Sequence, residues 1–280
     1  MKLILVKYKD FKSFERRLKV NHMTKKIIPR LLLFIIITVS AACAANSTAE
    51  RTGPPPAGTA AELITRADQL YNERAELQKV REGLVALRQA RAVEPGNYEA
   101  AWRLARMNYF LGEHTTDSSE RDKAFSDGEA AAKEAIKLNT NKADGHFWLG
   151  ANLGGQAEHS ALTGLAAAPD IRREMEAVIK LDEGYMHGSA YMVLARIDLE
   201  TPPVMGGDPK RAVELLEKGL KLGENNPLLR YYLAQAYLKT KRNEDARKQL
   251  ETVMNMQPDP NYLPEHADAV NKAKELMKKV

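Results

Sequence analysis

The chain has 280 residues, enough for one elongated solenoid or two compact domains. Its formal net charge is +5, but residues 1–42 hold ten of the 42 Lys and Arg residues and two of the 37 Asp and Glu residues, so residues 43–280 carry a net charge of −3. The overall charge therefore gives no support to nucleic-acid binding, and we expect no nucleic-acid partner.

The N-terminal segment has the features of a secretory signal. An apolar run, residues 31–39, follows the cations Lys25, Lys26 and Arg30 and precedes small residues up to Ala42. A basic region, a short apolar core and small residues before a cleavage site are typical of export signals. The run is too short to span a bilayer comfortably as a helix.

This signal predicts an exported chain that a lipid holds on a membrane. Residues 1–42 would be the leader, with translation starting at Met23, where a signal of normal length begins. Cys43 is the only cysteine and follows two alanines, as the lipidated cysteine of a bacterial lipoprotein does. Ordinary cleavage nearby, without lipidation, is the alternative. Residues 43–60 are small, polar and proline-rich, and they would form the lipid anchor and a flexible linker.

From residue 61 onward the sequence repeats a helical hairpin. Small and apolar residues recur three, four and seven positions apart on a first helix and then on a second, which is the pattern of the tetratricopeptide repeat of about 34 residues. The clearest copy, residues 227–262, has Ala234 and Ala246 where two backbones can approach closely and Pro258 where the second helix ends. Five copies are found, and their signatures begin at Ala67, Ala101, His146, Tyr191 and Arg230.

Three of the five copies have long turns between their two helices. We expect extended loops at residues 113–122, 154–170 and 200–209. Insertions of this kind lie on one side of a stack of repeats, often the functional side. The Gly206-Gly207-Asp208 turn predicts a sharp bend with positive φ, and Asp208 is placed to cap the helix that follows.

The predicted fold is helical throughout. Residues 264–279 form a last helix with many lysines on its outer face, as expected for the polar cap that ends a stack of repeats. No strand pattern is found. The sequence thus predicts an all-α fold, a tetratricopeptide-type α-solenoid of helical hairpins over residues 61–280 with a C-terminal capping helix.

The first helices of stacked repeats line a concave surface, and their register indicates which side chains face it. The lining is aromatic and apolar with two arginines, which suits an amphipathic carboxylate, a lipid-like molecule or a partner's helix. The alternative is that the cap and the insertions cover this surface and make it core. The candidate binding residues are Trp102, Arg106, Tyr109, Phe147, Met192, Arg196, Tyr231 and Gln235.

Motifs of catalysis and of metal or cofactor binding are absent from the sequence. The five histidines after the leader form no HExxH motif, no cluster with cysteine and no pair four residues apart. Neither a G-x-S-x-G turn nor a glycine-rich phosphate loop occurs. We therefore expect no metal, no cofactor and no enzymatic activity.

Three segments of the sequence, residues 146–150, 188–196 and 203–208, resemble one particular family. This is TatT, the tetratricopeptide lipoprotein associated with tripartite ATP-independent periplasmic (TRAP) transporters, and the similarity runs from about residue 61 to the C-terminus. The resemblance implies a periplasmic, membrane-anchored α-solenoid that forms a homotrimer and docks the substrate-binding P subunit of the transporter. It also implies a role in passing a hydrophobic, carboxylate-bearing ligand to or from the transporter.

Three functional hypotheses follow. The first is a ligand-handling accessory lipoprotein of a TRAP transporter, without enzymatic activity. The second is a scaffold lipoprotein that binds peptide or protein partners in envelope assembly. The third and weakest is a hydrolase that uses histidine and carboxylate within residues 154–170. An apolar channel would favour the first, an open groove with basic and asparagine contacts the second, and a bound metal the third.

Overall fold

The structure is a computed structural model that describes residues 58–158, 161–259 and 263–280. The predicted leader, Cys43 and most of the linker lie outside these residues. The described residues form eleven α-helices and no strand. The helices are α2 (Ala60–Asn72), α3 (Leu77–Val93), α4 (Tyr98–His114), α5 (Ser118–Leu138), α6 (Ala143–Glu158), α7 (Ala161–Leu181), α8 (Ser189–Glu200), α9 (Pro209–Leu222), α10 (Pro227–Lys239), α11 (Asn243–Asn255) and α12 (Leu263–Met277), with the 3₁₀ turn η1 (Pro203–Met205) between α8 and α9.

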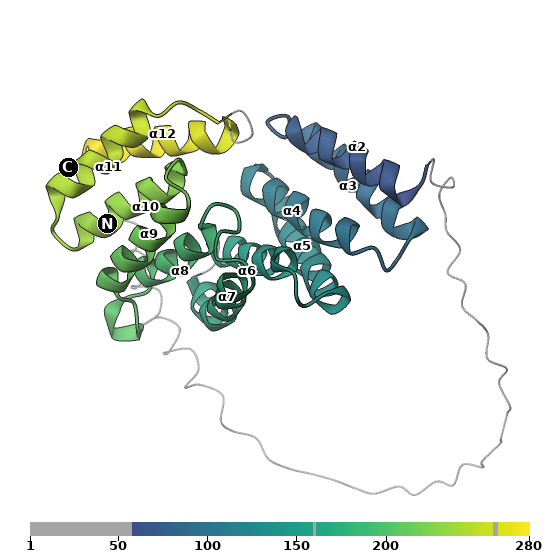
Figure 1. The fold of residues 1–280 in the computed structure, drawn as a ribbon, viewed down its shortest axis with the longest axis horizontal. Coiled ribbons are helices and arrows are strands. Elements are labelled where there is room, and N and C mark those ends of the chain that lie inside the picture. Colours follow the sequence, from purple (N-terminus) through teal and green to yellow (C-terminus); the bar gives the residue numbers. More distant parts are fainter. Residues whose placement is uncertain (1–57, 159–160, 260–262) are drawn as a thin grey trace, which may run out of the picture. The chain divides into compact units, whose positions relative to one another are not determined.

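Consecutive helices pack as five hairpins, which are α2 with α3, α4 with α5, α6 with α7, α8 with α9, and α10 with α11 (Figure 1). First helices of neighbouring hairpins also touch, α4 with α6 and α8 with α10, while α12 packs on α10 and α11. This arrangement confirms the predicted all-α, tetratricopeptide-type solenoid with a helix at its C-terminal end.

Side-chain caps explain where several helices begin. Thr59 and Glu62 form a reciprocal capping box at the start of α2. Asn97 caps α4, Asp117 caps α5 and Asn226 caps α10, each accepting a hydrogen bond from a backbone N–H of the first turn. A cap of this kind stabilises a helix by about 1 kcal/mol, so short polar residues set these boundaries.

Two of the three predicted long loops are wrong, because the chain is mostly helical there. Residues 113–122 belong largely to α4 and α5, and the Asp117 cap starts α5 within the predicted loop. Residues 154–170 are taken up mainly by the end of α6 and the start of α7. That segment is rich in alanine, the strongest helix former, and α7 continues through Pro169.

The third predicted loop is confirmed, and it bends sharply between α8 and α9. Gly206 has a φ of +96°, so the predicted positive φ is found at this residue. A Cβ on Gly207 would lie 1.8 Å from the carbonyl oxygen of Thr201, so only glycine fits this close approach. Asp208 caps α9, as predicted, by accepting hydrogen bonds of 2.9 and 3.2 Å from two backbone N–H groups.

A buried carboxylate joins three helices beside this turn. Asp198 of α8 is fully buried and accepts hydrogen bonds from Arg172 of α7 and Arg211 of α9, the latter through Nε at 2.6 Å. Arg211 also donates to the carbonyl oxygen of Gly206 at 3.2 Å. Two guanidinium groups offset the desolvation of one carboxylate, so this cluster ties the third hairpin to the fourth.

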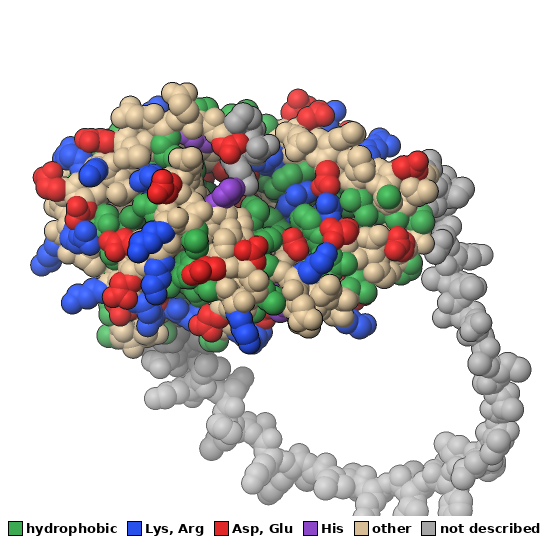
Figure 2. Space-filling model, viewed as in Figure 1, with side chains coloured by type: hydrophobic (Ala, Val, Ile, Leu, Met, Phe, Trp, Pro, Cys, Tyr) green, Lys and Arg blue, Asp and Glu red, His purple; other side chains and the backbone are tan. Residues whose placement is uncertain are grey.

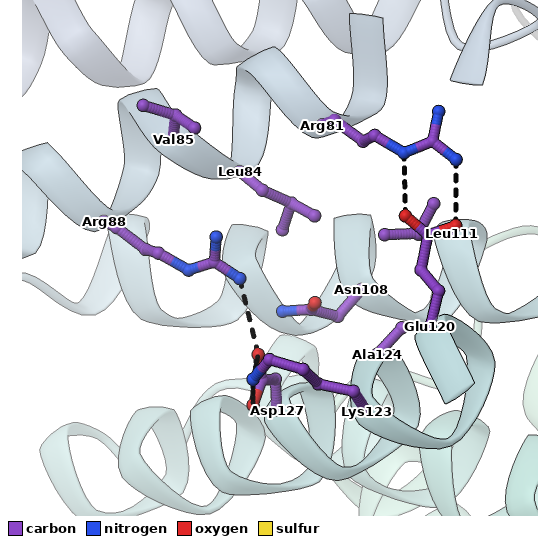
Figure 3. A pocket seen from close by; sticks show the side chains of 10 residues that line it. All are labelled: Arg81, Leu84, Val85, Arg88, Asn108, Leu111, Glu120, Lys123, Ala124 and Asp127. Atoms are coloured by element: carbon purple, nitrogen blue, oxygen red, sulfur yellow. Dashed lines mark hydrogen bonds and ion pairs between the residues drawn. The ribbon is translucent and has the colours of Figure 1, made fainter. Parts of the chain in front are cut away.

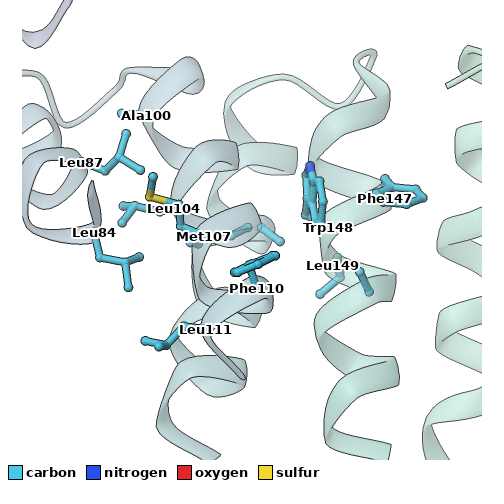
Figure 4. Packing of buried hydrophobic residues seen from close by; sticks show 14 of the residues in the cluster. Leu84, Leu87, Ala100, Leu104, Met107, Phe110, Leu111, Phe147, Trp148 and Leu149 are labelled. Atoms are coloured by element: carbon cyan, nitrogen blue, oxygen red, sulfur yellow. The ribbon is translucent and has the colours of Figure 1, made fainter. Parts of the chain in front are cut away.

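Glycines make room for the core between α4 and α6. Phe125 of α5 is buried where a Cβ on Gly112 of α4 or Gly155 of α6 would lie 2.6 or 2.2 Å from its ring. Figure 4 shows the neighbouring layer, in which Met107 and Phe110 of α4 lie between α3 and α6. The absence of side chains at the two glycines thus allows close packing of three helices.

The first hairpin and the last helix meet, although they are far apart in the sequence. Arg74, in the turn after α2, is buried and donates to both carboxylate oxygens of Glu265 in α12, at 3.1 and 2.8 Å. Its guanidinium carbon lies 4.7 Å from the ring centroid of Tyr71 and 5.8 Å from that of Phe110. The C-terminal helix is therefore held at both ends of the stack.

Candidate functional site

Polar side chains from five helices converge on a hollow inside the helical stack. The helices are α4, α6, α8 and α10, which are first helices of their hairpins, and α12. Figure 2 shows the surface hollowed near the centre of the view, in the region that α4, α10 and α12 surround in Figure 1. We call this site the inner hollow, and its residues are Tyr109, Glu113, Glu158, Arg196, Glu200, Tyr232, Asp268 and Lys272.

Arg196 of α8 is the central cation of the inner hollow. Its guanidinium group forms ion pairs with Glu158 of α6 and, at 3.2 Å, with Glu200 of its own helix. The guanidinium carbon also lies 5.0 Å from the ring centroid of Tyr232 in α10. Arg196 and Glu200 are four residues apart and so share one face of α8. Arg196 thereby links three helices across the hollow.

Glu113, at the end of α4, is a carboxylate without a counter-ion. Among the described residues it makes no hydrogen bond and no ion pair. Its pKa is raised to about 7, first by burial and then by the charge of Glu158, while Arg196 and Lys272 act in the opposite direction. Solvent still reaches the side chain of Glu113. Its ionised form is therefore destabilised but accessible to a ligand.

Two tyrosine hydroxyls in the hollow are also without partners. Within the described ranges, neither Tyr109 nor Tyr232 donates or accepts a side-chain hydrogen bond. Burial raises the pKa of Tyr109, and the nearby charge of Glu113 adds to this effect. The ring centroid of Tyr109 lies 5.7 Å from that of Trp148 and 6.3 Å from that of Phe125, which fixes its position.

Carboxylates outnumber cations in the inner hollow. Lys272 pairs with Asp268 within α12 at 2.6 Å, and Arg196 is already shared between two glutamates. Four carboxylates thus face two cations, counting Glu113 and Glu200. An excess of negative charge favours a positively charged group and disfavours a carboxylate. The local electrostatics therefore oppose the carboxylate-bearing ligand expected from the sequence.

The structure brings two of the predicted site residues, Tyr109 and Arg196, into the inner hollow. Tyr231 and Gln235 lie beside it on α10, where the Gln235 amide donates to the Tyr231 hydroxyl at 2.6 Å. The Tyr231 ring packs edge-on against that of Tyr232, with centroids 5.2 Å apart. These four residues lie on the first helices of their hairpins, as the repeat register predicts.

Two other predicted residues, Trp102 and Arg106, face the first hairpin. Arg106 pairs with Asp68 of α2 at 2.7 Å, and its guanidinium carbon lies 3.9 Å from the ring centroid of Tyr71. The same carbon lies 5.0 Å from the ring of Trp102, whose indole nitrogen donates to Glu99 at 2.8 Å. The charge and the rings of this group are therefore engaged within the protein.

The placement of Phe147 on the concave lining is wrong. Its side chain is only 5% exposed, and its ring centroid lies 5.0 Å from that of Trp148 and 5.2 Å from that of Tyr185 (Figure 4). The reason is that α4, α5 and α7 all pack on α6, so most of its circumference is buried. Met192 is partly buried against the core cluster of the C-terminal hairpins.

Several residues of the hollow are absent from the sequence-based candidates. Glu113 lies four residues after Tyr109, so the helix register already places both on one face of α4. Tyr232 lies next to Tyr231. Lys272 is on α12, whose lysines the sequence places on an outer face, and only the packing of α12 on α10 turns this side chain toward Tyr232.

A second concavity lies between α3 and α5 and has a volume of about 230 Å³ (Figure 3). Arg81 donates to both carboxylate oxygens of Glu120 at 2.7 and 2.8 Å. Asp127 forms ion pairs with Arg88 and Lys123. Three cations and two carboxylates of the rim are thus all engaged in ion pairs. This groove therefore has less to offer a ligand than the inner hollow has.

Two features of the described residues concern the hydrolase hypothesis and the relation to a membrane. In the part of the chain that the structure describes, no group of three or more His, Cys, Asp and Glu side chains is arranged to hold a metal ion. His159, in the segment considered for a hydrolase, lies outside the described residues. None of the described helices combines the length and apolarity that crossing a bilayer requires.

Comparison with protein families matches two parts of the chain. Residues 63–196 match the family described as regulator of microtubule dynamics protein 1-3, and residues 205–264 match a tetratricopeptide repeat family. Regulator of microtubule dynamics protein 3 from Rattus norvegicus is 25% identical over 203 residues, which is 67% of this chain. The chain spans only 43% of the length of that relative.

Solved structures support the same class of fold. TTC0263, a thermophilic tetratricopeptide-repeat protein of Thermus thermophilus, has a TM-score of 0.56 and 18% identity, covering 76% of this chain and 99% of its own. PilF of Pseudomonas aeruginosa has a TM-score of 0.52 and 16% identity, covering 79% of this chain and 92% of its own. At these identities the likeness concerns the fold alone. The fold and the hollow define this chain as a tetratricopeptide-type α-solenoid, a class suited to protein interactions.

Proposed function

We propose that this chain is a non-enzymatic scaffold that binds a segment of a partner protein in the inner hollow. One observation carries the proposal: the hollow gathers polar groups that the described residues leave without partners, the hydroxyls of Tyr109 and Tyr232 and the carboxylate of Glu113. Tyr109 and Tyr232 are half-buried and Glu113 is exposed, so a segment that enters the hollow can reach all three groups and supply hydrogen-bond and ion-pair partners. The tetratricopeptide-type fold supports this role because its first helices form a continuous inner surface.

Peptide selection tests the proposal directly. A phage-displayed library of random dodecapeptides is selected on the immobilised full chain, and the dissociation constants of enriched peptides are measured by fluorescence anisotropy. We expect Tyr232→Ala to weaken these peptides at least tenfold while the helical circular dichroism is unchanged. Glu244→Gln, on the exposed side of α11, is the matched control and should have no effect. Equal affinity for the wild type and Tyr232→Ala would refute binding in the hollow.

We also infer from the leader that the scaffold is exported and held by a lipid on Cys43 at the periplasmic face of a bacterial membrane, where it would serve envelope assembly. The basic residues, the apolar run and the lone cysteine support this location. Cys43→Ser should move the protein from the membrane fraction to the soluble fraction. Retention of the variant in the membrane fraction would contradict lipid anchoring.

A second candidate is an accessory protein of a TRAP transporter, in which a carboxylate ligand would have to displace Glu158 or Glu200 from Arg196, the cation beside the ring of Tyr232. In this role, suggested by the resemblance to TatT, a trimer would dock the P subunit and hold a hydrophobic carboxylate. Calorimetry with decanoate distinguishes the candidates. Binding that Arg196→Glu abolishes would support the transporter role, and absence of binding by the wild type would refute it.

A further inference from the structure

The charges of the inner hollow are not evenly paired. Arg196 is shared by Glu158 and Glu200, and Lys272 is held by Asp268 at 2.6 Å. Glu113 is left without a cation among the described residues. A positive charge that entered the hollow would therefore find one carboxylate with no competing partner.

The surroundings of Glu113 make this carboxylate sensitive to an added cation. Its own helix contributes Tyr109, which also interacts with Tyr232 of α10. Burial raises the pKa of Glu113, and so do the charges of Glu158 in α6 and Asp268 in α12. Arg196 of α8 and Lys272 of α12 lower this pKa. Glu200 forms an ion pair with Arg196. The net result is a pKa of about 7. Attraction between opposite charges is stronger where water is partly excluded.

The aromatic side chains near Glu113 indicate which kind of cation the site would bind. The hydroxyls of Tyr109 and Tyr232 have no hydrogen-bond partner among the described residues. The Tyr232 ring already lies 5.0 Å from the guanidinium carbon of Arg196, so aromatic surroundings of this kind suit a guanidinium or alkylammonium group. In the same part of the chain no arrangement of three metal-binding side chains is found. The site therefore fits an organic cation better than a divalent metal ion.

We propose that a lysine or arginine side chain of the partner segment enters the inner hollow and pairs with Glu113, close to the hydroxyls of Tyr109 and Tyr232. This inference rests on the proposed function and names the part of the partner that is recognised. Charge complementarity then makes a basic segment the preferred occupant, because an acidic one would face the excess of carboxylates.

The test uses peptides from the selection described above. We expect the enriched peptides to share a basic position, and replacing it by norleucine, which keeps the stem and removes the charge, should weaken binding at least tenfold at pH 8. Glu113→Gln should cause a similar loss, whereas Glu244→Gln should cause none. Because the ionised fraction of a group with a pKa of about 7 rises from about one tenth to about nine tenths between pH 6 and pH 8, wild-type affinity should rise about tenfold over this range. The Glu113→Gln variant should lose this rise.

The outcomes separate this inference from the proposed function. Peptides that depend on Tyr232 but bind equally well with norleucine would overturn the recognition of a basic side chain and leave the scaffold role standing. Peptide affinity that changes neither with Glu113→Gln nor with pH would likewise overturn the recognition of a basic side chain and leave the scaffold role standing. Failure of Tyr232→Ala to weaken any selected peptide would overturn both.

Discussion

Glu113→Gln should stabilise the protein, and the gain should grow with pH. The carboxyl of Glu113 has a pKa of about 7 in the folded chain, raised from an ordinary value of 4.5 by burial and by Glu158. The folded state therefore binds this proton more tightly than the unfolded state does. Folding stability is lost as pH rises from about 4.5 to about 7 and does not return above that range. Glutamine carries no charge, so the variant lacks this loss.

The size of the effect follows from the two pKa values. At about 1.4 kcal/mol per pKa unit, the change from 4.5 to about 7 sets an upper limit of about 3.5 kcal/mol. Solvent reaches the side chain of Glu113 and screens its charge, so we expect a gain of about 1–2 kcal/mol at pH 8. At pH 5 the gain should be small, because Glu113 is then mostly protonated in the folded state.

Urea denaturation followed by circular dichroism at pH 5, 6, 7 and 8 measures this gain. The quantity of interest is the difference in unfolding free energy between Glu113→Gln and the wild type at each pH, because the common pH dependence of all other groups cancels. Glu244→Gln should show no trend. A difference that stays constant from pH 5 to pH 8, or that falls, would refute the description of Glu113 as a destabilised carboxylate.

Three further predictions concern stability. Gly155→Ala should destabilise the protein by about 1–3 kcal/mol in urea denaturation, because its Cβ would lie 2.2 Å from a buried phenyl ring. Gly154→Ala should instead stabilise α6 by up to about 1 kcal/mol, because no atom lies within 4 Å of the added Cβ. Equal effects of the two substitutions would contradict the close packing of Phe125 on Gly155. Asp198→Asn should cost about 2–3 kcal/mol, because two arginines lose the carboxylate they share, and an unchanged denaturation midpoint would count against that role. Glu265→Gln should speed hydrogen exchange in α12 by weakening its contact with Arg74, and unaltered exchange would show that the contact does not hold the helix.

The repeat pattern was sufficient to predict the fold class. Small residues such as Ala234 and Ala246 recur at helical spacing, and both are completely buried in the structure. Local signals also identified the bend at Gly206 and the cap at Asp208, because a positive φ and a capping carboxylate depend only on neighbouring residues. Loop lengths were predicted less well, since alanine-rich insertions can continue a helix.

The binding surface could be predicted only in part. Helix register placed Tyr109 and Arg196 correctly on inner faces, because residues four apart on a helix share a face whatever the helix packs against. The same argument failed for Phe147, whose exposure depends on how many neighbours surround α6.

The sequence by itself thus determined that the described chain forms stacked helical hairpins with polar and aromatic side chains on their first helices. The tertiary structure alone decided that Glu113, Tyr232 and Lys272 belong to one hollow and that no described residue forms an ion pair with Glu113 there. The physical reason is distance along the chain. Electrostatic interactions link Glu113 of α4 to Asp268 and Lys272 of α12, more than a hundred positions away, and local periodicity carries no information about such interactions.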